Sequence, residues 1–103
     1  MRFQLIIQLP GDTSADLDGL VTLEDELVGQ LCSSAEVDGH DIGRSQGNIF
    51  VLTDSPAATF AQIRPLLLQK RLLGEARVAY RNLSGGAFTV LWPESFSGQF
   101  VVA

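Results

Sequence analysis

The stretch from Asp38 to Pro56 constrains the fold more than any other part of the chain. Gly43 and Gly47 bracket a short loop between two segments of strand character, which is typical of a β-hairpin. Pro56 then stands where a helix would start. Proline is favoured in the first helical turn because its missing N–H group has no helical partner there. The stretch therefore predicts the order strand, turn, strand, helix.

The segments on either side extend this order. Residues 2–9 alternate apolar and polar side chains with the period of a strand, and Pro10 with Gly11 ends it. Residues 12–19 are rich in Asp, Ser and Thr and are expected to form a loop. Further strands are expected at 35–44, with a bulge at Gly39, and at 48–53, 75–83 and 87–92, the last two joined by a turn at 84–86.

A first helix is expected to begin at Thr22, a favoured N-cap residue, with Asp25 three positions later as a weakened capping box. Gly29 lies inside it. Because glycine costs a helix about 1 kcal/mol relative to alanine, Gly29 is expected to face the sheet or a neighbouring backbone. Helical spacing predicts four inward apolar residues, Leu23, Leu27, Val28 and Leu31, and three outward acids, Glu24, Asp25 and Glu26.

A second helix is expected from a cap at Asp54 or Ser55 to Gly74. Pro65 removes one backbone hydrogen bond and is expected to kink it. The tail from Phe96 to the C-terminus is expected either to add a short edge strand or to dock on an apolar patch. The helix is expected to face the core through Phe60, Ile63 and Leu67.

The resulting order β-α-β-β-α-β is that of the ferredoxin-like or split βαβ arrangement, an antiparallel sheet with two helices on one face, here with an extra C-terminal hairpin strand. We expect an α+β protein with a single domain over residues 1–103, because a chain of 103 residues has room for one two-layer core. A different α+β order of the same elements is the competing fold.

Composition predicts a cytoplasmic domain. Although 46% of the residues are hydrophobic, the apolar runs are far below the roughly 20 residues that span a bilayer, so no membrane partner is expected. The N-terminal strand lacks the cleavage site of a signal peptide. The single cysteine, Cys32, excludes an internal disulfide and fits an intracellular protein.

Charge is distributed unevenly along the chain. Residues 1–54 contain ten acidic and two basic residues, whereas residues 55–103 contain two acidic and five basic residues, within a net charge of −5. The pattern favours two halves that pack together and partly neutralise each other. The alternative is a head-to-tail or two-fold contact between copies.

The polar segment at 38–41 is where the lone histidine stands beside carboxylates. His40 and Asp41 are weak candidates for an acid–base pair, and Asp38 joins them as a candidate metal ligand. In a regular strand, however, Asp38 and His40 point to one side and Asp41 to the other. A structural role is therefore favoured, and no metal or cofactor is expected.

Two further motif overlays are poor. Residues 14–25 can be aligned with an EF-hand loop, but the first and last ligand positions are weak and no helix precedes them, so a capped loop is favoured. Residues 46–53 share Gly47, Phe50 and Val51 with the RNA-recognition signature. A net charge of −5 repels phosphate, so no nucleic acid partner is expected.

The alternation of the strand at 75–83 places Arg77 and Arg81 on the helix-free face of the sheet, beside Gln4 and Gln8. This face is expected to be open in a lone monomer. It is then either solvated, or meets a second copy or another partner, or binds a small anion. The candidate ligand- or partner-binding residues are thus Asp38, His40, Asp41, Arg77 and Arg81.

The run from Asp38 to Leu68, DGHDIG…GNIFVLTDSPAATFAQIRPLL, resembles small bacterial proteins of unassigned function that carry an Asp-Gly-x-Asp-Ile-Gly, Asn-Ile-Phe, Thr-Asp-x-Pro pattern. The resemblance implies a stand-alone bacterial cytoplasmic domain and brings no active site.

We expect a non-enzymatic domain that acts by protein–protein association, as a homodimer through the sheet face or an edge strand or with another protein. A small-ligand-binding regulatory or sensor domain is the first alternative, on fold analogy alone. A minor enzyme centred on His40 and Asp41 is the second.

Overall fold

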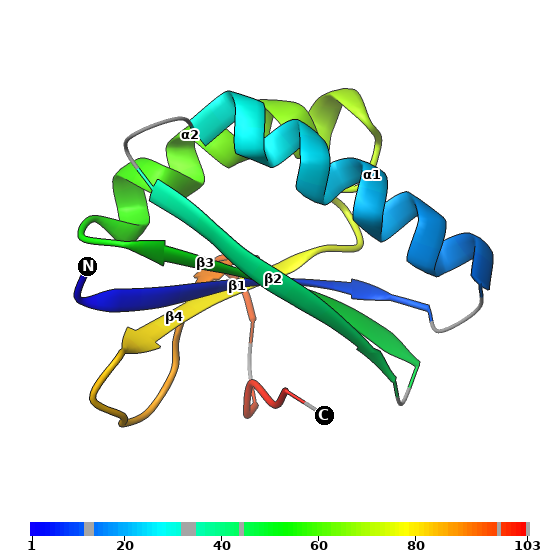
Figure 1. Ribbon diagram of the computed structural model, residues 1–103. Helices are drawn as coiled ribbons and strands as arrows, with labels where there is room; N and C mark the ends of the chain where they lie inside the picture. The colour runs from blue at the N-terminus through cyan, green and yellow to red at the C-terminus, as the bar shows by residue number, and fades with distance from the viewer. Residues whose placement is uncertain (12–13, 32–34, 44, 97, 103) are drawn as a thin grey trace.

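The computed structural model describes residues 1–11, 14–31, 35–43, 45–96 and 98–102 (Figure 1), and the side chains of 14 and 15 are also left undescribed. Cys32 and Arg44 lie outside the described residues. Within the described part, no helix is long and apolar enough to cross a membrane. The elements are β1 (Phe3–Pro10), α1 (Ser14–Leu31), β2 (Ala35–Gly43), β3 (Gln46–Thr53), α2 (Pro56–Gln69), β4 (Arg77–Asn82) and β5 (Thr89–Trp92).

The expected α+β class, with an antiparallel sheet and two helices, is confirmed. The strand order is β2-β3-β1-β4-β5, with Ile7 of the central strand opposite Ile49 of β3 and Val78 of β4. In β2 the register shifts between Val37 and Gly39, which confirms the bulge expected there. Both helices lie on one side of the sheet, and the C-terminal end of the chain lies on the other (Figure 1).

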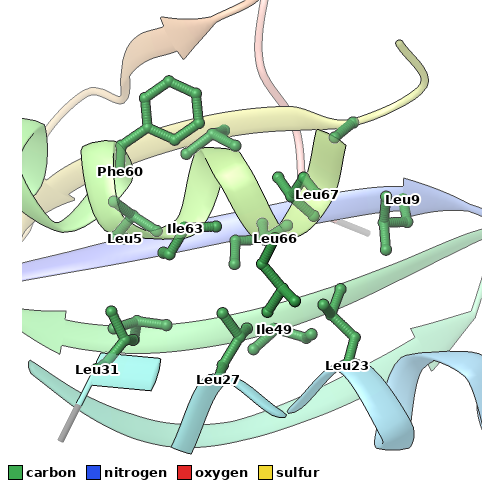
Figure 2. Close-up of a cluster of buried hydrophobic side chains, with 14 of the residues drawn as sticks. Leu5, Leu9, Leu23, Leu27, Leu31, Ile49, Phe60, Ile63, Leu66 and Leu67 are labelled. Atoms are coloured by element: carbon green, nitrogen blue, oxygen red, sulfur yellow. The ribbon is translucent and has the colours of Figure 1, made fainter. Parts of the chain in front are cut away.

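The main core lies between the helices and the sheet (Figure 2). Leu5 and Ile7 both point into it because alternate residues of a strand share a face. Leu27 of α1 and Leu67 of α2 pack onto the same cluster. Burying one such side chain contributes about 1.5–3 kcal/mol, so this cluster holds the two layers together. Its fully buried members are Leu5, Ile7, Leu23, Leu27, Ile49, Val51, Ile63, Leu67 and Val78.

The start of α1 differs from the sequence prediction. The helix begins at Ser14, so the loop expected over residues 12–19 is wrong from residue 14 on, residues 12 and 13 lie outside the described residues, and the cap expected at Thr22 is wrong. The Thr22 hydroxyl instead donates to the carbonyl of Asp18 at 2.9 Å, a bond within the helix. The early start has a packing reason: Leu20 is buried and lies against Gly47, whose missing side chain leaves room for it. A helix here also removes the basis of the EF-hand overlay.

The buried side of α1 is narrower than expected. Val28 was expected inside, but its side chain is 58% exposed. Gly29 was expected against the sheet, yet it is exposed, and apart from its chain neighbours and its own helix backbone no atom lies within 4 Å of the position its Cβ would take. Both expectations are wrong because one stripe at helical spacing already fills the core side, and it consists of Leu20, Leu23, Leu27 and Leu31.

The second helix starts as expected and ends early. Pro56 occupies the start of α2, but Ser55 makes no side-chain cap bond. The helix ends at Gln69 rather than at Gly74. The chain leaves the helical conformation because Arg71 adopts a φ of 60°, in the left-handed region.

Candidate functional site

A row of four polar side chains crosses the helix-free face of the sheet. Asp41 of β2 lies opposite Asn48 of β3. Asn48 also lies opposite Gln8 of β1, which in turn lies opposite Arg77 of β4. We call these four residues the polar row. Its centre is as buried as the core, since Asn48 is 1% and Gln8 is 6% exposed.

Hydrogen bonds satisfy the buried amides of the polar row. The Asn48 side-chain amide donates to Asp41 Oδ1 at 3.0 Å. The two hydrogens of the Gln8 amide are shared among three acceptors, namely Asn48 Oδ1 at 3.1 Å, Gln46 Oε1 at 2.8 Å and the backbone carbonyl of Val101. Buried polar groups are stable only when they are bonded in this way, and a bonded network holds its members in one orientation. The row therefore presents fixed donors and acceptors on this face.

An apolar patch lies next to the polar row. Ile6 and Ala79 are fully buried, and Phe50 packs against them from β3. We call these three residues the apolar centre. Cross-strand pairing sets them side by side, because Ile6 lies opposite both Phe50 and Ala79. A sheet face with such a centre needs a cover to keep the centre from water.

The cover is the C-terminal segment, residues 98–102 (Figure 1). Phe100 is 6% exposed and packs on the apolar centre, with its ring 5.0 Å from that of Phe88 in an edge-to-face contact. The Gln8 amide donates to the carbonyl of Val101 at 2.9 Å, although the Val101 side chain is 55% exposed. Of the two alternatives for the tail, the described residues show docking: they form no strand after Trp92. The face expected to be open is therefore partly covered by the chain itself.

Arg77 and Arg81 lie on this face, as the alternation of β4 predicts. The Arg77 guanidinium stacks 5.3 Å from the Phe96 ring, and that of Arg81 lies 5.0 Å from the Phe88 ring. Arg81 also donates from Nε to Gln4 Oε1 at 3.3 Å. Beside Arg81 a hollow of about 480 Å³ remains, lined by Gln4, Ile6, Phe50, Arg81, Phe88 and the C-terminal segment. The arginines therefore flank the segment and the hollow next to it.

The acidic cluster around His40 is divided between the two faces. His40 turns to the helix side, where its Nδ1 lies 3.0 Å from Glu24 Oε1, whereas Asp41 bonds to Asn48 on the helix-free side. Asp38 lies at the bulge and is exposed. The described residues contain no group of three His, Cys, Asp or Glu side chains that could hold a metal. The Glu24 carboxylate, expected to point outward, is half-buried and faces β2.

Sequence reasoning missed two parts of this site, the role of Asn48 and the burial of Gln8, whereas docking of the tail was one of its two alternatives. The sequence contains a pattern that could have indicated the roles of Asn48 and Gln8. Gln8 is a polar residue between two large aliphatic residues of a strand, Ile7 and Leu9, and Asn48 directly precedes the apolar run that starts at Ile49. A polar residue at such a position is either solvent-facing or part of a bonded network, and the local pattern cannot distinguish the two.

Comparison of the chain with protein-family models, with curated proteins and with solved structures finds no match.

Proposed function

We propose that this protein is a non-enzymatic association domain of ferredoxin-like topology. The strand order β2-β3-β1-β4 supports the topology, with α1 linking β1 to β2 and α2 linking β3 to β4, so that β5 is the added hairpin strand. An enzyme centred on His40 and Asp41 is not proposed, because these two side chains lie on opposite faces of the sheet.

The working surface that we propose is the helix-free face, and its ligand is a polypeptide segment with an aromatic side chain. One observation carries this proposal: the face already holds such a segment, the chain's own C-terminus. The buried Gln8 amide bonds to the backbone carbonyl of Val101, while Phe100 fills the apolar centre. Peptide-binding domains use a related combination, in which hydrogen bonds to the peptide backbone supply affinity and side-chain pockets supply specificity.

The C-terminal segment then competes with any partner for this face. A tethered segment acts at an effective concentration in the millimolar range. A partner segment must therefore bind well enough to displace Phe100 from the apolar centre. Homodimerisation through this face, as expected from the sequence, requires the same displacement.

The test uses the full-length Phe100→Ala chain as receptor and a fluorescein-labelled peptide of residues 94–103 as probe. In this receptor the chain's own segment lacks its anchor, so we expect the peptide to bind it at least about tenfold more tightly than it binds the wild-type chain. Fluorescence anisotropy measures both affinities. A Val101→Ala receptor, altered at an exposed side chain, should behave as wild type.

The matched control is the same peptide with alanine at position 100, which should not bind either receptor. Equal affinity of the original peptide for the wild-type and Phe100→Ala chains would contradict the proposal, as would binding of the alanine peptide. Circular dichroism of the Phe100→Ala chain establishes that the receptor is folded.

A small-ligand sensor is the second candidate, because a cavity of about 370 Å³ lies between the start of α1 and the end of β1. This volume falls within the range of small-molecule sites. Leu9, Leu20 and Leu72 contribute apolar walls, and Lys70 and Glu75 contribute charges. The test is a ligand screen by thermal shift on wild type and on Leu72→Trp, which fills the cavity. Hits that stabilise both proteins equally would exclude this site.

A further inference from the structure

The helix layer separates charge between its two helices. The segment that forms α1 contains five acidic residues and no lysine or arginine, whereas Arg64 is the charged residue of α2 and is followed by Lys70 and Arg71. Lys70, the residue after α2, forms an ion pair with Glu26 of α1. The uneven charge along the sequence is thus an uneven charge in space, with an acidic helix beside a basic one.

The basic helix also carries an exposed apolar groove. The groove has a volume of about 390 Å³ and is lined by Ala57, Phe60, Ala61, Arg64, Pro65 and Leu68. Leu68 is 65% exposed and extends the apolar lining of the groove to the surface. The two alanines leave the helix surface open to close approach. Arg64 stands at the edge of the groove, with its guanidinium 4.6 Å from the Trp92 ring.

The acidic helix presents a matching surface. Val28 is 58% exposed, and Asp25, one turn earlier on the same side of α1, is exposed as well. An aliphatic side chain with a carboxylate one turn away complements an apolar groove with a guanidinium at its edge. Opposite charges at an interface of this kind select the partner and its orientation.

We propose that the groove of α2 binds α1 of a second copy of this chain, with Val28 in the groove and Asp25 opposite Arg64. The contact is two-fold symmetric: α2 of the first copy receives α1 of the second, and the reverse contact forms at the same time, so the assembly closes as a dimer. The two helix layers then face each other and both sheet faces stay outward. This goes beyond the proposed function, because it makes the protein a bivalent binder.

Sedimentation velocity of the full-length chain from about 1 to 500 μM tests the dimer. We expect a monomer–dimer equilibrium that weakens between about 50 mM and 500 mM salt, since exposed charges are screened. Arg64→Glu and Asp25→Arg should each raise the dimer dissociation constant at least about tenfold, because each places like charges opposite each other. The double variant, with both charges reversed, should recover most of the affinity.

The matched control is Arg2→Glu, the same reversal outside the helix layer, which should leave the equilibrium unchanged. A wild-type chain that is monomeric at 500 μM would overturn the proposal. Failure of the double variant to recover affinity would also overturn it, as would open-ended association beyond a dimer.

A dimer that responds to Phe100→Ala but not to Arg64→Glu would place the contact on the sheet face instead. The double variant Arg64→Glu, Phe100→Ala should still bind the C-terminal peptide. Failure of the dimer proposal would therefore leave the peptide-binding proposal unaffected.

Discussion

Asn48 occupies a position that would ordinarily carry an aliphatic side chain. It lies in β3 between the polar Asp41 and the buried Gln8, and its amide group bonds to both. A valine here would leave the Gln8 and Asp41 groups without these partners. A buried amide such as that of Asn48 lowers stability unless it is hydrogen-bonded, so its bonds to Gln8 and Asp41 are needed for Asn48 to be tolerated in the sheet.

Asn48→Ala is therefore expected to lower the free energy of unfolding by about 1–3 kcal/mol, because it removes the hydrogen bonds of a buried amide to Gln8, Asp41 and Gln46 and leaves a void in its place. Urea denaturation followed by circular dichroism measures the loss. Asp38→Ala, at an exposed position in the same hairpin, serves as the control and should stay within about 0.5 kcal/mol of wild type. Similar small effects for both variants would show that the network does not stabilise the fold.

The start of α2 is stabilised by hydrogen bonds to the last residue of the preceding strand rather than by a conventional N-cap side chain. Thr53, the last residue of β3, accepts a hydrogen bond from the Ser55 N–H at 3.0 Å, and its hydroxyl lies 2.7 Å from that of Thr59. Asp54, the other expected cap, accepts a bond from the Arg2 backbone instead. Both threonines are buried, so this junction ties the helix to the sheet in a fixed position.

Thr53→Val keeps the shape of the side chain but removes both hydrogen bonds. We expect it to lower the free energy of unfolding by about 1–3 kcal/mol, because the Ser55 N–H and the Thr59 hydroxyl lose their partner. Ser55→Ala should cost less than about 0.5 kcal/mol, since Ser55 makes no cap bond. Chemical denaturation compares the two. A larger loss for Ser55→Ala, in the range of ordinary N-cap residues, would show that Ser55 is the cap.

The sheet is covered on both sides by different means. The helices cover one face with a large cluster of aliphatic side chains, and the other face has a smaller cluster around Ile6, Ala79 and Phe100. The second cluster depends on a few residues at the end of the chain. We therefore expect the second cluster to open more readily than the first, which maintains the fold.

Phe100→Ala is expected to lower the free energy of unfolding by about 2–4 kcal/mol, below the largest values for phenylalanine in a protein core, because the surroundings open to water and a void does not persist. Val101→Ala, at a side chain that is 55% exposed, should change it by less than about 0.5 kcal/mol. Urea denaturation of both variants provides the comparison. Equal losses would mean that Phe100 does not anchor the segment.

Local patterns in the sequence were sufficient for the strands, the hairpin with its bulge at Gly39 and the start of α2 at Pro56, because alternation, glycine and proline act on a few neighbouring residues. They were insufficient for the start of α1, which depends on the fit of Leu20 against Gly47, a residue of another strand. The site required the tertiary structure for the same reason. Whether Gln8 is buried and what covers Ile6 depend on strand register and on a segment more than ninety residues away along the chain.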